Sequence, residues 1–514
     1  MGNSFEARLV WAYGIDSQYS RKSAVFEFAN GCRRQYQTAS FSNPDTSYID
    51  DQISAHSFST DTKTYSTQLD PAYVTQSMLT NGTVLKNETQ HFAMWYGVQT
   101  GNFSYAHEQT AGVAWSDFLN DAGRWMEEVW DLDNNVLSAP MPYASDANPK
   151  RINIYICGTG LPSFPNGDNE DCGATAAASV FVSSVYMQYG STTMMHEFTH
   201  SIQFYTGGFQ GRDSAGPFWE THANWDSSTL SPSFENAVEY YTDNLENGPL
   251  WSNSRYGAYP FLMSLYERDS TRGLLWSIWQ QNKRDASGTS LEDQVETMVR
   301  LGQANGAFPG GMKSFGDDMG WYGARLATMD FYNQKMFLDV YTDVYTTKRF
   351  VGLQAGGSAN NYVSLAERPL YEYGTHIVPL TTSGSSGMIS AKVTGGTSGN
   401  GASWRFTIAG LDANNNPSYA PLTAVDGTGS NSVAINATAG TRYFLVVTAT
   451  PTSYQSLGWE GSGPIPNQYP YSVNILGATP LMTAANTCTS HSGAGGQDLN
   501  WNTNGHSTDA TACP

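Results

Sequence analysis

The sequence predicts an α+β protein in which a domain of sheet and helices precedes an all-β sandwich. Its 514 residues exceed the size at which a single hydrophobic core stops growing, so two or three domains are expected. Residues 88–350 alternate strand-like runs with stretches of helical periodicity, whereas residues beyond 365 form short apolar runs between Gly, Ser and Asn turns. This change of pattern separates the two main domains.

Four regions follow from these patterns along the chain. They are a mixed or β-leaning N-terminal region at 1–87, the sheet-and-helix domain at 88–355, the sandwich at 365–480 and a low-complexity tail at 481–514. We expect the N-terminal region, where runs such as LVWAYG and AVFEFANG alternate with polar turns, to pack on the second region.

The second region begins with a predicted strand, helix and strand. ETQHFAMWYG alternates like a strand, SDFLNDAGRWMEEVW has apolar residues at helical spacing, and KRINIYICG is a β-branched run that ends in Gly. STTMMHEFTHSIQFYTGG predicts a helix that is capped by Ser191 or Thr192 and ends at Gly207 and Gly208. Four amphipathic helices are expected after residue 234, in ENAVEYYTDNL, YPFLMSLYERD, GLLWSIWQQNKR and LEDQVETMVRLG.

The third region has the strand spacing of a β-sandwich. Its predicted strands are GMISAKVTGG, WRFTIAGLD, NSVAINATAG, RYFLVVTATP and YPYSVNIL.

Charge and composition exclude some classes of partner. The chain has 46 Asp and Glu against 26 Lys and Arg, for a net charge of -20, so it repels phosphate backbones and anionic lipid. It contains no long apolar run that could span a membrane. The polar and aromatic composition favours a secreted protein, and because MGNSFEARLVWAYG lacks the features of a signal peptide, we expect the chain to represent the mature form. The oligomeric state is not indicated.

The five cysteines are expected to form two local disulfides. Cys157 and Cys172 bracket one polar loop, Cys488 and Cys513 bracket the tail, and Cys32 is left unpaired. The alternative is five free thiols. No pair has the spacing of zinc ligands, so a zinc site built from sulfur is not expected.

The string HEFTH carries the chemistry. His196 and His200 are four residues apart on a predicted helix, so both imidazoles project from one face and can bind one metal ion. Glu197 lies about 100° round the helix, where it can reach a water molecule at the metal without being a ligand itself. The alternative is a structural helix with polar residues at this spacing.

A catalytic zinc site needs a third protein ligand. A third histidine at position 206 would complete the metzincin arrangement, but Gln203 and Thr206 stand where that arrangement requires Gly and His. The acidic candidates are Asp213, which lies in a glycine-flanked loop, and Glu220. We favour Glu220 because aromatic and apolar residues at helical spacing place it on a packed second helix. Asn224, one turn later, can accept the outer N–H of a liganding histidine.

The two motifs together resemble a known family. HEFTH followed after twenty positions by Glu220, within the string WETHANW, is similar to the gluzincins, the thermolysin-like clan of zinc metallopeptidases, and to secreted bacterial metalloproteases with H-E-x-x-H-x-x-Q and E-x-x-A-x-W patterns. The resemblance covers about residues 88–350. It implies that His196, His200 and Glu220 hold Zn²⁺, that Glu197 is the general base, and that the domain has the zincin fold, with a mixed sheet above and helices below.

The sequence departs from thermolysin-like enzymes at two points. Asn224 stands where those enzymes carry an acidic residue, and their downstream histidine region is absent. The donor that stabilises the transition state is therefore open among Tyr256, Tyr259 and His222. We favour Tyr256, which we expect to open a helix just after the Glu220 segment. His91, at the start of a predicted strand, is interpreted as structural.

A second cation site is a weaker expectation. The acidic loop NGDNED at 166–171 offers oxygen ligands for Ca²⁺ but lacks EF-hand spacing, so a solvated loop is the alternative. The expected function is a secreted zinc metallopeptidase acting on a protein or glycoprotein. The alternatives are a zinc-dependent hydrolase or binding protein that acts on glycans, and an adhesive module with an inactive site.

Overall fold

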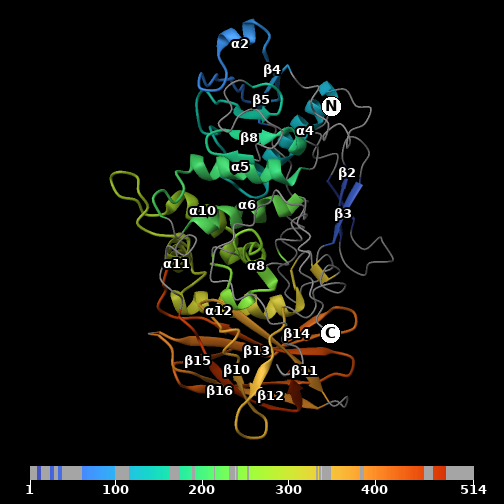
Figure 1. The fold of residues 1–514 in the computed structure, drawn as a ribbon, viewed down its shortest axis with the longest axis vertical. Coiled ribbons are helices and arrows are strands. Elements are labelled where there is room, and N and C mark those ends of the chain that lie inside the picture. Colours follow the sequence, from blue (N-terminus) through green and yellow to red (C-terminus); the bar gives the residue numbers. More distant parts are fainter. Residues whose placement is uncertain are drawn as a thin grey trace.

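The computed structural model has the α+β architecture that the sequence predicts (Figure 1). It describes three strands within residues 9–37, and residues 61–481 apart from the segments 99–114, 162–173, 188–190, 213–214, 231–237, 239–240, 252–253, 332–333, 335–336, 339–348, 383–386, 400 and 457–466. Layers stack along the long axis of the molecule, from a mixed sheet through helices to a β-sandwich (Figure 1).

The upper layer is a five-stranded mixed sheet. Its strands in spatial order are β4 (Val84–Glu88), β5 (Phe92–Gly97), β6 (Ile152–Cys157), β8 (Val180–Ser183) and β7 (Ala174–Ala176). The three central strands are parallel, and both edge strands are antiparallel to their neighbours. ETQHFAMWYG does form a strand, but β5 is buried almost throughout instead of alternating, because it lies between two strands with core on both faces.

Helices connect the strands of this sheet along the chain. The short helix α2 (Gln76–Thr80) precedes β4, and α4 (Trp115–Asn135) connects β5 to the parallel strand β6. The boundary expected at residue 87 falls inside β4, whose hairpin with β5 places residues on both sides of that boundary in one sheet. The 3-10 turn Ser184–Tyr186 follows β8.

Two helices form the middle layer below the sheet, α5 (Thr192–Tyr205) and α6 (Gly216–Leu230) (Figure 1). Ser191 is the N-cap of α5 and accepts a hydrogen bond from the backbone N–H of Met194, as expected from the sequence. The chain leaves α5 through Gly207 and Gly208, whose positive φ angles of 80° and 45° suit glycine.

The described lower helices, three of which the sequence predicts, follow α6 along the chain. They are α8 (Pro260–Tyr266), α9 (Asp269–Arg272), α10 (Leu274–Gln281), α11 (Gln294–Asn305) and α12 (Met312–Thr328), preceded by a 3-10 turn at Leu245–Asn247. The expectation for YPFLMSLYERD, GLLWSIWQQNKR and LEDQVETMVRLG is confirmed by α8, α10 and α11. Part of ENAVEYYTDNL, residues 235–237 and 239–240, lies outside the described residues. The sequence patterns did not single out α12.

Three glycines on one face of α12 explain both its low helical signal and its position. Gly316, Gly320 and Gly323 face the sandwich, where an added Cβ would lie 3.1 Å from Thr450, 2.5 Å from Arg405 and 2.2 Å from the Thr448 hydroxyl, respectively. Glycine lowers helix propensity, but here it lets the helix approach the sheet closely.

The lower layer consists of two sheets that share a hydrophobic core. One has the order β16 (Ser430–Asn436), β12 (Met388–Gly395), β18 (Tyr471–Leu476), β10 (Asn361–Ser364) and β9 (Leu353–Ala355). The other has the order β14 (Pro417–Tyr419), β13 (Ser403–Leu411), β17 (Arg442–Ala449), β11 (Thr375–Thr382) and β19 (Ala478–Pro480), with β15 (Thr423–Asp426) paired to β13. All five predicted strands are present, and β9 and β10 extend this layer to before residue 365.

The N-terminal region contributes a three-stranded antiparallel sheet of β1 (Leu9–Ala12), β2 (Ser23–Glu27) and β3 (Arg33–Gln37). Among the described residues, no helix combines the length and apolar character needed to cross a bilayer. Cys157 is disulfide-bonded. The other four cysteines lie outside the described residues, as does most of the expected tail.

Candidate metal centre

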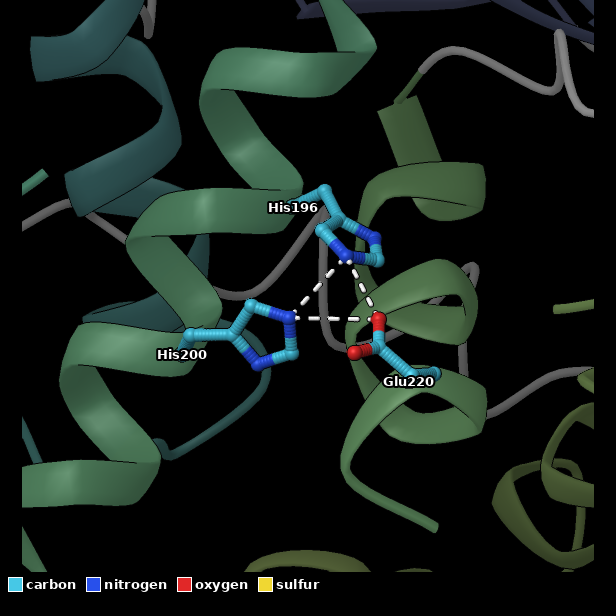
Figure 2. A group of neighbouring side chains, drawn as sticks. All are labelled: His196, His200 and Glu220. Carbon is cyan, nitrogen blue, oxygen red and sulfur yellow. Dashed lines mark hydrogen bonds and ion pairs between the residues drawn. The ribbon is translucent and has the colours of Figure 1, made fainter. Parts of the chain in front are cut away.

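The packing of α5 against α6 brings His196, His200 and Glu220 together (Figure 2). Nε2 of His196 lies 3.1 Å from Oε2 of Glu220, and Nε2 of His200 lies 3.3 Å from the same oxygen. The two Nε2 atoms are 3.0 Å apart. The helical repeat aligns the two histidines along α5, and α6 supplies the carboxylate from the opposite side.

This triangle of atoms fits a small divalent cation. Tetrahedral Zn²⁺ binds N and O ligands at about 2.0–2.2 Å, which places two such ligands about 3.3 Å from each other. The observed separations of 3.0–3.3 Å agree with that geometry. Two imidazoles and one carboxylate are the donor set of many catalytic zinc sites, which keep a fourth position for water. Among the described residues, this is the one cluster of His, Cys, Asp and Glu that could hold a metal ion.

Asn224 orients the first histidine. Nδ1 of His196 donates to Oδ1 of Asn224 over 2.6 Å, and Nδ2 of Asn224 donates to the backbone carbonyl of Tyr256 over 2.6 Å. Because Nδ1 carries the proton, Nε2 presents its lone pair to the centre of the triangle. Asn224 thus lies where the sequence analysis expects it.

Gln203 orients the second histidine in the same way. Nδ1 of His200 donates to Oε1 of Gln203 over 2.8 Å, and Nε2 of Gln203 donates to the carbonyl of Trp219 over 3.1 Å. In the sequence, Gln203 served only to exclude a metzincin arrangement, and this role was not predicted. The available signal was its spacing, because residues three apart on a helix lie side by side.

Electrostatics within the triangle keep its carboxylate ionised and favour a proton on His200, which a bound cation would have to displace. Burial alone would raise the pKa of Glu220, but the imidazoles of His200 and His196 lower it well below its usual range. Burial alone would lower the pKa of His200, but the carboxylate of Glu220 raises it to about 9. Glu220 is therefore ionised at neutral pH.

Glu197 follows the first histidine on α5 and is 7% exposed. Burial raises the pKa of its carboxyl group, with a further increase from Glu220, while His196 and His200 act in the opposite direction. A carboxylate that is poorly solvated and close to an open ligand position is a stronger base than one in water.

Tyr256 lies beside the histidines. Its ring centroid is 6.3 Å from that of His196, with 29° between the ring planes, and the guanidinium of Arg255 lies 5.0 Å above its ring. Burial and the nearby Glu220 raise the pKa of Tyr256 to about 12. The expectation that Tyr256 opens a helix is wrong: it lies in a turn, and α8 begins at Pro260, which has the backbone angle suited to a first helical position.

The other candidates for the oxyanion donor, His222 and Tyr259, are buried in the helical core. His222 is fully buried among Trp225, Trp276 and Trp279, and burial lowers its pKa to about 3. Tyr259 is 1% exposed within the helical core.

His91 stacks on Trp130 and contacts Glu127 over 2.6 Å, an arrangement that agrees with its structural interpretation. Asp213 and the acidic loop 166–171 lie outside the described residues.

Comparisons with known proteins place the chain in a family. A search of the curated proteins found no match. The model of the family of unknown function DUF6055 matches residues 43–482, which include the candidate metal centre and both main layers of the fold. The chain therefore belongs to this family of unknown function, DUF6055.

Proposed function

We propose that this protein is a secreted zinc-dependent peptidase that acts on proteins or glycoproteins. The observation that carries the proposal is the convergence of His196, His200 and Glu220 on one point. The buried Glu197 interacts electrostatically with all three. The hydrogen bonds that the two histidines donate to Asn224 and Gln203 support the proposal further, because they hold both imidazoles with Nε2 facing that point.

His196, His200 and Glu220 would hold the zinc ion. When bound, zinc would supply Lewis-acid chemistry that polarises a scissile carbonyl and makes a water molecule more acidic. Asn224 and Gln203 would hold the proton of each imidazole on Nδ1, so that Nε2 faces the zinc ion once it has released its own proton.

Glu197 would act as general base and then as general acid. Its carboxylate would take a proton from the attacking water and deliver it to the nitrogen of the leaving amine, which must be protonated before it departs. The burial that raises the pKa of Glu197 supports both steps, because it makes the carboxylate a better proton acceptor at neutral pH.

Tyr256 would stabilise the negative charge that develops on the carbonyl oxygen. The raised pKa of about 12 keeps its hydroxyl protonated and able to donate. Its ring lies next to His196, and the hydroxyl interacts electrostatically with Glu220 and Glu197. A preorganised donor at such a site accelerates acyl transfer.

The layered arrangement supports a zincin-like domain as part of the proposal. A mixed sheet lies above α5, and α6 and the other helices lie below it, in the order that the resemblance to gluzincins implies (Figure 1). The disulfide at Cys157 supports export to an oxidising environment.

Metal analysis combined with peptide cleavage tests this function. The purified full-length protein is expected to contain one zinc ion per chain and to cleave members of a library of peptides and glycopeptides. Glu197→Gln is expected to retain the zinc and lose cleavage, whereas Glu367→Gln, at an exposed position on the lower layer, should behave as wild type. Absence of bound metal, or full activity of Glu197→Gln, would rule out the mechanism. Cleavage confined to glycans would favour the glycan-acting alternative.

A further inference from the structure

A pair of buried carboxyl groups lies close to Thr199 of α5. Asp133 is in the last turn of α4 and Asp226 is on α6, and each is 0% exposed. The two carboxyl groups lie close enough to interact, and each shifts the pKa of the other. Apart from that contact, no donor within the described part of the chain reaches either oxygen of Asp133 or Oδ1 of Asp226.

A hydrogen bond between two carboxyl groups requires a proton, because an ionised carboxylate can only accept. Burial raises the pKa of Asp133 well above its usual range, and the adjacent Asp226 raises it further. Burial also raises the pKa of Asp226, to about 7, although Thr199, Asp133 and His196 act in the opposite direction. Two carboxylates in contact inside a protein cannot both ionise, so one proton stays between them.

Thr199 connects this pair to the helix that carries the histidines. Its Oγ1 lies 2.5 Å from Oδ2 of Asp226 and 3.0 Å from the carbonyl of Met195, so its hydroxyl can donate to the carboxylate. Thr199 precedes His200 directly, and Asp226 lies on the helix that carries Glu220. The contact therefore couples α5 to α6 close to the level of the metal ligands.

We propose that Asp133 and Asp226 share one proton, and that this carboxyl pair acts through Thr199 as a positioning group for the metal ligands. The positioning role rests on the proposed function, since it concerns the same three ligands. A small shift of α5 along α6 would separate the two imidazoles from the carboxylate of Glu220. The buried hydrogen bond from Thr199 to Asp226 opposes that shift. His196 on α5 is the other titratable group that acts on Asp226.

The pH dependence of stability tests the shared proton. A group whose pKa is raised on folding stabilises the protein fully below its ordinary pKa, and this contribution is lost as the pH rises through the pKa of the folded state. Asp133→Asn replaces the shared proton with an amide N–H. Urea unfolding of the full-length proteins gives the folding constant of wild type and of Asp133→Asn at each pH. The ratio of the wild-type constant to that of the variant should fall about tenfold per pH unit from about pH 4 towards about pH 7.

The ratio of the two folding constants cancels the contributions of groups that both proteins carry. A ratio that does not change with pH would overturn the shared proton, because it would mean that the Asp133 carboxyl group adds no bound proton to the folded chain relative to the unfolded chain.

Metal affinity tests the positioning role without reference to peptidase activity. Thr199→Val keeps the shape of the side chain but removes the bond to Asp226, and it should weaken zinc binding about 10–100-fold in competition with a chelator. Thr199→Ser should restore the affinity. The visible absorption bands of the Co²⁺-loaded protein should change in Thr199→Val and recover in Thr199→Ser.

Three outcomes separate the proposals. Wild-type affinity and wild-type Co²⁺ bands in Thr199→Val would overturn the positioning role while leaving the proposed function intact. A wild-type protein that binds neither zinc nor Co²⁺ would overturn the proposed function and the positioning role together. The unfolding measurements would still decide the shared proton on their own.

Discussion

Asn224 holds His196 in a fixed orientation through a hydrogen bond of 2.6 Å between Nδ1 and Oδ1. The same amide is anchored by its Nδ2 to the carbonyl of Tyr256, so one side chain connects α6, a metal-binding histidine and the turn that carries the candidate oxyanion donor. Both the oxygen and the nitrogen of the Asn224 amide form hydrogen bonds, and the side chain is fully buried. This relationship makes its removal informative.

We expect Asn224→Ala to weaken zinc binding about 10–100-fold, as loss of a residue that orients a ligand generally does. Removal of the amide leaves His196 free to rotate and to change tautomer. Competition with a chromophoric chelator measures the affinity. Asn224→Asp keeps an acceptor for Nδ1 of His196 and should retain more of the affinity than alanine does, so equal losses in the two variants would speak against this role.

Glu220→Ala should abolish stoichiometric zinc in the purified protein, because it removes one of three ligands and leaves two histidines, which do not make a stable catalytic site. Asp213→Ala is the matched control and should keep its metal. Elemental analysis of both variants beside wild type gives the result. Loss of zinc in Asp213→Ala with retention in Glu220→Ala would reassign the third ligand.

Removal of the metal should lower the unfolding temperature of the protein. A ligand that binds only the folded state stabilises it by about 2.7 kcal/mol at a concentration one hundred times its Kd. Scanning calorimetry with and without a chelator measures this shift. His200→Ala should unfold at one temperature in both buffers, and a shift as large as that of wild type would place the metal elsewhere.

Tyr256→Phe should lower kcat about 10²–10³-fold, the usual cost of losing one oxyanion donor, while zinc content stays unchanged. Steady-state kinetics on a peptide identified in the library screen provides the test. Tyr259→Phe, three residues away in the buried core, is the matched control and should leave kcat near wild type. If both variants retain wild-type kcat, the donor is another group.

Gly323→Ala should lower the free energy of unfolding by about 1–3 kcal/mol, the usual cost of overpacking. The new Cβ would lie 2.2 Å from the Thr448 hydroxyl and 2.7 Å from that of Thr375, which forces α12 away from the sandwich despite the better helix propensity of alanine. Urea unfolding measures the difference. Gly273→Ala, whose Cβ would meet no atom within 4 Å, is the control and should change stability little.

Features that depend on neighbours along the chain could be predicted from the residues alone. The spacing of His196 and His200 places both on one face of a helix whatever surrounds it, and Ser191 caps that helix because the cap bonds to a backbone group three residues away. The strands of the lower layer follow in the same way from alternation and turn residues.

Contacts between residues far apart in the sequence depend on how the helices pack. The carboxylate of Glu220 reaches the histidines because α6 packs on α5, and nothing in the local pattern states that contact. Gln203 reaches the carbonyl of Trp219, and Thr199 reaches Asp226, through the same packing. The glycines of α12 lower its helical signal because they allow close contact with the sandwich. Helical periodicity predicts which side chains share one face of a helix. The residues that this face contacts depend on which other element packs against it.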